Sequence, residues 1–248
     1  MSPHILTIDI ETSPNLAHVW ALWNQNVGLS QLREASEVMC FAAKWYDEDD
    51  VIFYSGRDDG RDEMIRAAHD LLSEADIVVT YNGKKFDIPH LNREFIEVGL
   101  TPPAPFKQVD LYQTVRRQFR FPSNKLDYVA QKLELGAKTS HTGHQLWVDC
   151  LAGDDEAWAL MQTYNEHDVI LTEALYDRLL PWITQHPTVA LFAPEVEPQC
   201  PACGGTSLQR RGQAYTSVSV YQRYQCNGCG KWSRGGQKVL GTDLRSTS

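Results

Sequence analysis

Residues 4–11 of the chain read HILTIDIE. Apolar and polar side chains alternate along this stretch, which is the pattern of a β-strand with one apolar face. Asp9 and Glu11 therefore lie together on the polar face of the predicted strand. Two carboxylates in this arrangement are about 7 Å apart along the chain, close enough to share a divalent cation. The run predicts a first strand and a first candidate metal position.

Strands and helices are expected to alternate after this run. Further strands are predicted at residues 38–46, 51–55, 76–81 and 106–111, and helices at 61–75, 86–98, 112–119, 125–133 and 154–180. This order predicts an α/β domain with a mixed central sheet flanked by helices. Residues 20–37 and 136–148 show no regular periodicity and are left unassigned, with 138–144 expected to be a polar loop.

Two more carboxylates, those of Asp87 and Asp168, have either a structural role or a role in binding a metal. Asp87 comes two residues before Pro89, a context that favours a helix N-cap. Asp168 lies in the middle of the apolar stripe of the last long helix, one turn from Tyr164. A lone carboxylate there needs a partner. A hydrogen bond to Tyr164 or His167 would serve, but a metal site shared with other acids also explains why the position is charged.

Together these segments resemble the DEDD superfamily of 3′→5′ exonucleases, whose fold is RNase H-like. The three motifs of that superfamily are matched by Asp9-Ile10-Glu11, by Asn82-x-x-x-Phe86-Asp87 and by Tyr164-x-x-x-Asp168. The second motif has the form seen in family B polymerase proofreading domains, to which residues 109–111 and 125–130 are also similar. The third has the tyrosine form, because the histidine form would need His where Thr163 stands. The resemblance covers about residues 3–180.

The resemblance implies a metal-dependent exonuclease that uses two Mg²⁺ or Mn²⁺ ions and releases 5′-mononucleotides. Asp9, Glu11 and Asp168 would hold one ion, with Asp9 also touching the second ion and Asp87 acting through bound water. Tyr164 would orient the nucleophilic water, because an unperturbed phenol is a poor base at neutral pH.

The resemblance also implies contacts with the substrate. Asn82 and Phe86 would contact the 3′-terminal nucleotide, Phe86 by stacking, although a core position is an equal alternative for Phe86. Single-stranded DNA is the expected substrate, with RNA as the alternative, and a replication or repair protein is a candidate partner. The competing functions are an RNase H-like endonuclease and, outside enzymes, a nucleic-acid-binding adaptor on an inactive nuclease body.

Four of the six cysteines form two Cys-x-x-Cys pairs, Cys200/Cys203 and Cys226/Cys229, which are separated by 22 residues. A glycine follows each pair and allows a tight turn. The spacing suits four thiolates on one tetrahedral Zn²⁺ and resembles a zinc ribbon. Two pairs outside a thioredoxin-like context argue against a redox dithiol.

Proline and charge mark off this cysteine module. Five of the 12 prolines fall between residues 181 and 201, which predicts a nuclease domain at 1–190, a linker at 191–198, a zinc ribbon at 199–235 and a flexible tail at 236–248. Residues 199–248 carry a net charge of +6 and residues 1–198 carry −15. The basic residues are interleaved with Tyr and Trp, which favours single-stranded nucleic acid over a protein as the ligand of the ribbon.

Length and composition limit the remaining classes. A chain of 248 residues is too short for a polymerase with its own proofreading domain. No apolar run comes near the ~20 residues needed to span a bilayer, so no membrane contact is expected. The lack of a visible secretory signal, together with the paired cysteines, predicts a cytoplasmic location.

Overall fold

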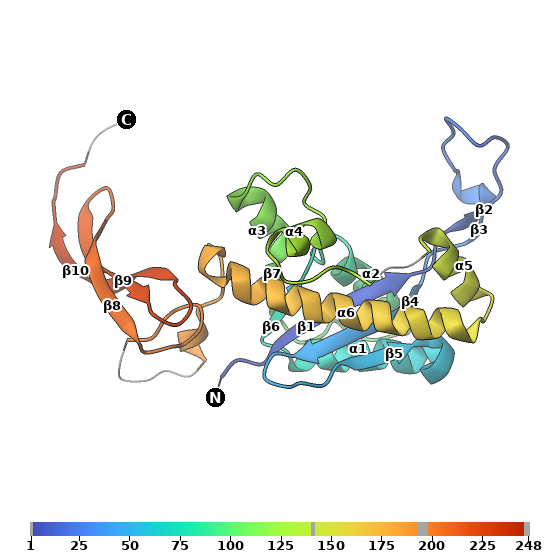
Figure 1. Ribbon diagram of the computed structural model, residues 1–248, viewed down its shortest axis with the longest axis horizontal. Coiled ribbons are helices and arrows are strands. Elements are labelled where there is room, and N and C mark those ends of the chain that lie inside the picture. The colour runs from blue at the N-terminus through green and yellow to red at the C-terminus, as the bar shows by residue number, and fades with distance from the viewer. Residues whose placement is uncertain (1, 140–141, 193–197, 246–248) are drawn as a thin grey trace. The chain divides into compact units, whose positions relative to one another are not determined.

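The computed structural model describes residues 2–139, 142–192 and 198–245 (Figure 1). The chain divides into two compact units, one of His4–Leu175 and one of Tyr176–Ser248 together with Met1–Pro3. The larger unit carries the acidic motifs, and the smaller unit carries the four paired cysteines. Most of the linker predicted at 191–198 lies outside the described residues.

A five-stranded mixed sheet with the order β5-β4-β1-β6-β7 forms the centre of the larger unit. Its strands are β1 (Ile5–Thr12), β4 (Val38–Trp45), β5 (Ile52–Ser55), β6 (Ile77–Thr80) and β7 (Lys107–Asp110). β1 pairs antiparallel with β4 and parallel with β6. The prediction of a mixed sheet flanked by helices is confirmed.

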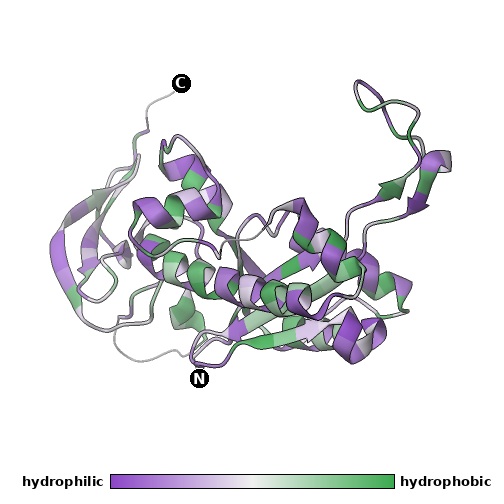
Figure 2. Ribbon diagram, turned by 45° about the vertical axis from the view of Figure 1, so that its right-hand side comes forward, coloured by the Kyte–Doolittle hydropathy of each residue, from purple (hydrophilic) through white to green (hydrophobic). Residues whose placement is uncertain are grey.

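The alternating side chains of β1 are sorted between the two faces of this sheet. Leu6, Ile8 and Ile10 are buried in a core with residues of α1 (Arg61–Glu74) and α2 (Asp87–Glu97). The strands of the main sheet are accordingly largely green in the hydropathy colouring of Figure 2. Apolar burial on this side fixes the register of β1 and turns its polar residues to the other side.

The second face of the sheet is covered by α5 (His144–Leu151) and α6 (Asp155–Leu179). Apolar residues of β4 pack there against side chains of both helices. The Lys44 ammonium also donates to the Glu173 carboxylate at 2.7 Å, and both side chains are mostly buried. These contacts hold α6 across the face on which Asp9 and Glu11 lie.

Two shorter helices, α3 (Leu111–Gln118) and α4 (Leu126–Lys132), follow β7. The Asp110 carboxylate caps α3 by accepting from the Gln113 N–H. One-turn 3₁₀ helices lie at Leu29–Gln31, Leu180–Trp182 and Val189–Leu191, and a π-helical turn lies at Gly56–Gly60. Within the described ranges, no helix is long and apolar enough to cross a membrane.

Each of the two regions left unassigned by the sequence contains regular secondary structure within its described residues. β2 (Leu16–Ala17) pairs with β3 (Leu32–Glu34) and forms the base of an arm, residues 16–34, whose loop projects from the larger unit in Figure 1. Trp20 and Trp23 near its tip are 97% and 82% exposed. The second region, 136–148, contains the start of α5.

A separate three-stranded sheet, in the order β10-β9-β8, lies in the smaller unit. It consists of β8 (Leu208–Tyr215), β9 (Ser219–Cys226) and β10 (Trp232–Gly241). The prediction of a flexible tail from residue 236 is wrong for its first part, because residues 236–241 belong to β10. Lys238 and Leu240 pair with β9 beyond a bulge. The glycines of this stretch therefore interrupt the regular pairing but do not end the strand.

Candidate active site

The pairing of β1 places its two acids at the end of a ladder. β1 and β6 pair from Ile5–Ile77 to Thr7–Val79, and β1 then continues beside β4, with Asp9 opposite Ala42. Glu11 follows on the same face of the strand. Both carboxylates are therefore presented beyond the last β1–β6 pair, at the edge where β6 ends and its loop begins.

Three acids from distant parts of the sequence converge at this edge. One carboxylate oxygen each from Asp9, Glu11 and Asp168 lie within 4.8 Å of one another. Asp87 is buried at the start of α2, and its Oδ1 accepts from the Ile10 N–H at 3.2 Å. The N-cap alternative for Asp87 is wrong, because Phe86 is the N-cap residue and the Asp87 carboxylate is hydrogen-bonded to β1.

Burial and crowding make charge costly for these carboxyl groups. Burial raises the pKa of Glu11 to about 8 and of Asp87 to about 7, and it raises the pKa of Asp9 and of Asp168 as well. Neighbouring carboxylates raise the pKa of Asp9 and Glu11 further. Such a group of acids requires a compensating positive charge if it is to be ionised at neutral pH.

Lys138 supplies one positive charge at this site. Its Nζ donates to the Tyr164 hydroxyl at 3.0 Å and forms an ion pair with Asp168. Although burial opposes its charge, the Asp168 carboxylate raises the pKa of Lys138, which stays protonated. The sequence predicts only a polar loop here. No local pattern identifies Lys138, because contacts between distant parts of the chain place it.

Two further polar residues hold the acids and were also missed. The buried Asn165 side chain donates to Asp9 Oδ2 at 2.8 Å and to the Asp9 carbonyl at 3.3 Å. Trp147 of α5 donates a hydrogen bond to Glu11. Asn165 could have been suspected, because it lies three residues before Asp168 and shares its side of the helix. Trp147 lies in a region with no sequence signal.

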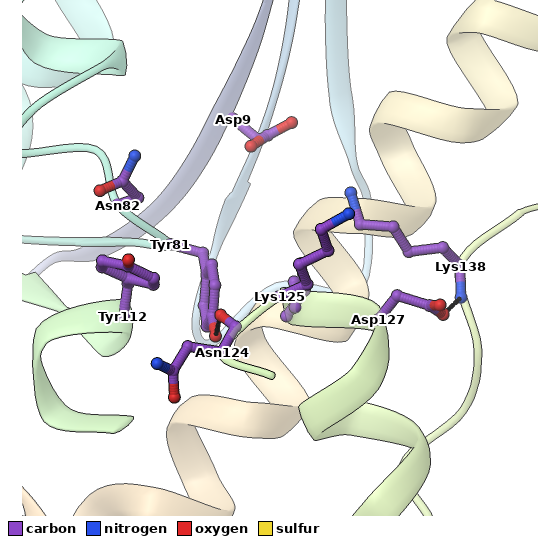
Figure 3. A pocket seen from close by; sticks show the side chains of 9 residues that line it. Asp9, Tyr81, Asn82, Tyr112, Asn124, Lys125, Asp127 and Lys138 are labelled. Carbon is purple, nitrogen blue, oxygen red and sulfur yellow. Dashed lines mark hydrogen bonds between the residues drawn. The ribbon is translucent and has the colours of Figure 1, made fainter. Parts of the chain in front are cut away.

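A cleft of about 550 Å³ opens beside Asp9 (Figure 3). Its walls are formed by Asp9, Tyr81, Asn82, Tyr112, Asn124, Lys125, Leu126, Asp127 and Lys138. This volume is in the range of small-molecule and cofactor pockets. Phe86 is outside this lining, but it is 39% exposed and packs beside the His90 ring, so it is not a core residue.

The loop after β6 has a conformation that depends on two residues. Asn82 has a φ of +73°, and its backbone N–H donates to Asp110 Oδ1 at 3.0 Å. A Cβ on Gly83 would approach the Thr80 side chain to 2.5 Å, so a larger residue would clash there. The loop thereby brings Asn82 into the cleft and leads the chain to Asp87.

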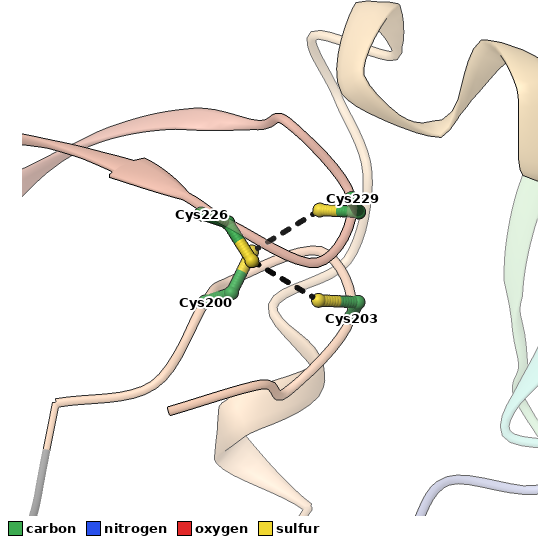
Figure 4. Close-up of side chains that lie close together, drawn as sticks. All are labelled: Cys200, Cys203, Cys226 and Cys229. Atoms are coloured by element: carbon green, nitrogen blue, oxygen red, sulfur yellow. Dashed lines mark hydrogen bonds between the residues drawn. The ribbon is translucent and has the colours of Figure 1, made fainter. Parts of the chain in front are cut away.

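The four paired cysteines form a second candidate metal site, in the smaller unit (Figure 4). The Sγ atoms of Cys200 and Cys229 are 3.6 Å apart, as are those of Cys203 and Cys226. All four Sγ atoms lie within 4.8 Å of one another. Four thiolates bonded to one Zn²⁺ at about 2.3 Å would have sulfurs about 3.8 Å apart. The cluster therefore fits a tetrahedral zinc ion.

The backbone around the two cysteine pairs repeats one hydrogen-bond pattern. The Cys200 N–H donates to the Gly205 carbonyl and the Gly204 N–H to the Cys200 carbonyl. The Cys226 N–H likewise donates to the Lys231 carbonyl and the Gly230 N–H to the Cys226 carbonyl. Gly204 and Gly230 have φ values of +73° and +78°, which explains why glycine follows each pair.

Comparison with known proteins adds a family to this geometry. The family model of the RNase H superfamily matches residues 27–180. The chain belongs to the RNase H superfamily. The match includes Asp87, Tyr164 and Asp168 but begins after β1, so that Asp9 and Glu11 precede it. None of the curated proteins matches the chain.

The RNase H superfamily domain also has a similar fold among solved structures. The family B DNA polymerase from the hyperthermophilic archaeon Pyrobaculum calidifontis matches with a TM-score of 0.58 and 20% sequence identity. The match covers 88% of this chain and 32% of the polymerase chain, so this protein spans about a third of that polymerase. At this identity the likeness concerns the fold.

One atom tests whether the acidic residues of this RNase H superfamily domain fit a cation. Asp168 Oδ1 is buried and, among the described residues, has no hydrogen-bond partner. Asp168 is also one of the three acids whose oxygens converge. Carboxylate oxygens are the preferred ligands of Mg²⁺ and Mn²⁺. The residues therefore fit a divalent cation held by Asp9, Glu11 and Asp168.

Proposed function

We propose that this protein is a metal-dependent 3′→5′ exonuclease that releases 5′-mononucleotides from single-stranded DNA. One observation carries the proposal: Asp9, Glu11 and Asp168 converge within 4.8 Å, in an RNase H superfamily domain. The superfamily implies a nucleic-acid substrate. The order of the motifs along the chain supports the exonuclease activity.

Each acid has a defined part in the proposed site. Asp9, Glu11 and Asp168 would hold one Mg²⁺ or Mn²⁺, Asp9 would also reach a second ion, and Asp87 would contribute through water. Bound ions of this kind neutralise charge on the attacking and leaving oxygens of a phosphodiester. Asn165 and Trp147 keep Asp9 and Glu11 oriented through their hydrogen bonds.

Tyr164 orients the attacking water in this proposal. Burial raises the pKa of Tyr164 above its ordinary value, so the phenol stays protonated at neutral pH. A protonated hydroxyl can hold a water in line by hydrogen bonding but cannot remove its proton. Lys138 donates to the same hydroxyl and so fixes its direction.

The cleft beside Asp9 receives the 3′-terminal nucleotide. Asn82 offers an amide to a base or sugar, and Lys125 offers a charge to a phosphate. Phe86, which is partly exposed, is available for stacking. The ribbon, which one Zn²⁺ on its four cysteines would stabilise, binds single-stranded nucleic acid.

A time course on labelled strands tests the function. A 5′-labelled strand with Mg²⁺ should give a descending ladder, and a 3′-labelled strand should give mononucleotide at once. Asp168→Asn should lower turnover by about a thousandfold or more, whereas the matched Glu156→Gln, exposed on the same helix, should not. Tyr164→Phe should lower turnover by up to about 10²–10⁴-fold. Near-native turnover of folded Asp168→Asn would contradict the proposal.

The competing functions give different products in the same assay. Early internal fragments from a closed circle would indicate an endonuclease. A faster ladder on the matching RNA strand would make RNA the substrate. Binding of both strands without turnover in Mg²⁺ or Mn²⁺ would indicate an adaptor.

A further inference from the structure

Strand pairing sorts the basic and aromatic residues of the ribbon between two faces of its sheet. Trp232 is paired with Gln225, and Arg234 with Arg223. Because side chains alternate along a strand, Trp232 and Arg234 share one face with Arg223 and Tyr221. The sequence shows these residues interleaved, and the register shows which of them act together.

Direct contacts confirm this arrangement and add Arg211. The guanidinium of Arg223 lies 4.8 Å from the centre of the Trp232 ring, and that of Arg211 lies 5.6 Å from the same ring. Farther along the same face, the guanidinium of Arg234 lies 4.3 Å from the centre of the Tyr221 ring. Three guanidiniums therefore flank two aromatic rings on one side of the sheet.

Hydrogen bonds hold two of these arginines in place. Arg223 Nε donates to the Arg211 carbonyl at 2.9 Å, and the Arg211 guanidinium donates to Gln225. A Cβ on Gly212 would lie 3.2 Å from Arg223 Nη2, and Gly212 has a φ of +72°. The bulge at Gly212 thus leaves room for Arg223 on this face.

The opposite face carries less charge. Arg210, the sequence neighbour of Arg211, is paired with Tyr224 and lies on the other side of the sheet. Tyr215 also lies there and is 74% exposed. The two faces therefore differ by two arginines, and each offers exposed aromatic surface for comparison.

We propose that the arginine–tryptophan face (Arg211, Tyr221, Arg223, Trp232 and Arg234) binds single-stranded nucleic acid through phosphates and stacked bases. This proposal rests on the proposed function, because single-stranded nucleic acid is the substrate proposed there. Residues 199–242 contain no acidic side chain, which favours a polyanion. Trp232 is 45% exposed, and a ring flanked by guanidiniums suits an unpaired base better than a charged peptide.

Fluorescence anisotropy of full-length protein with labelled oligo(dT) tests the proposal, with Asp9→Asn as the background and no added divalent ion. Trp232→Leu should weaken binding about tenfold, and its matched control Tyr215→Leu less than twofold. Arg211→Gln should weaken binding severalfold and lower the salt slope by about 0.7, whereas the adjacent Arg210→Gln should have the smaller effect. Zinc content and circular dichroism check that each variant is folded.

An abasic strand of equal length separates stacking from charge. It should bind the parent protein several times more weakly than oligo(dT) and should be insensitive to Trp232→Leu. Equal affinity of both strands, or equal losses from Arg210→Gln and Arg211→Gln, would overturn the proposal. Hydrolysis by the parent chain is assayed separately. If the parent chain hydrolyses DNA but variants of the two faces lose affinity equally, this inference alone is refuted. If the arginine–tryptophan face binds the strand but the parent chain shows no hydrolysis, the exonuclease proposal alone is refuted.

Discussion

Single residues at the acidic site work against the stability of the folded chain. Asp9, Glu11, Asp87 and Asp168 lie close together and are partly or fully buried, and Lys138 offsets part of their charge. A buried carboxylate without a cation is destabilising when it is ionised. The residues that fit a metal ion therefore make the metal-free protein sensitive to pH.

The free energy of unfolding, without added divalent ions, is expected to fall as pH rises from about 4 to about 8. In the folded protein Glu11 and Asp87 have pKa values of about 8 and about 7. These values exceed the ~4.3 and ~3.9 of an unfolded chain, so the folded state binds more protons and stability is lost as they ionise. Thermal melts across this range measure the trend.

Two controls accompany these melts. Mg²⁺ should restore much of the lost stability at pH 8, because it binds the ionised acids of the folded state. Glu11→Gln should flatten the dependence on pH. A melting temperature that rises from pH 5 to 8 without divalent ions would contradict the interpretation.

Replacing Lys138 with Met should have opposite effects on the metal-free and the metal-bound protein. The Lys138 ammonium compensates Asp168, so its loss should lower the melting temperature without divalent ions. The same ammonium competes with a cation for Asp168, so the Mg²⁺ concentration at half-maximal stabilisation should fall severalfold. Lys125→Met, on the wall of the same cleft, removes an equal charge. Equal shifts in both variants would show a general charge effect.

At the scale of elements, the sequence predicts strands and helices that have a periodic pattern of apolar residues. It does not predict site residues whose positions depend on contacts between distant parts of the chain. Alternation along residues 4–11 predicts β1 and the common face of Asp9 and Glu11, and the 154–180 stripe predicts the inward position of Asp168. Lys138 and Trp147 reach the site from a short irregular segment and from α5, and neither has a periodic pattern. Their positions depend on packing between distant parts of the chain.

The turn after β6 is expected to tolerate only glycine at position 83. Gly83→Ala would place a Cβ 2.5 Å from Thr80, so the turn must shift, at a cost of roughly 1–3 kcal/mol. Turnover should fall as well, because this turn positions Asn82 and Asp87. Gly28→Ala, whose Cβ would meet its nearest atom at 3.6 Å, is the control. Chemical denaturation of both variants measures the difference, and equal stability would refute the argument.

At the scale of the molecule, the two units have different sources of stability. The larger unit has two apolar cores built from its sheet and helices. Among the described residues 198–245 of the smaller unit, the buried apolar side chains are Cys200, Ala202 and Cys226. So small a core needs a further source of stability, and the four-cysteine cluster can provide it through zinc.

Loss of zinc is therefore expected to unfold the ribbon sheet and to leave the larger unit folded. In Cys226→Ser, amide hydrogens of β8, β9 and β10 should exchange much faster, while those of β1, β4 and β6 keep their protection. Cys150→Ser changes a buried cysteine of the larger unit and should leave ribbon exchange unchanged. Exchange followed by mass spectrometry measures both, and unchanged ribbon protection in Cys226→Ser would contradict a structural zinc site.

The arm gives the molecule an intrinsic optical reporter. Trp20 and Trp23 are almost fully exposed. Trp182 and Trp232 are only about half exposed, at 54% and 45%, and Trp45 and Trp158 are 9% and 8% exposed. Indole emission shifts to longer wavelength in water, so the arm should dominate the red part of the fluorescence spectrum and be readily quenched by iodide. Any molecule that covers the tip would shift this emission to the blue and protect it from iodide, without an added label.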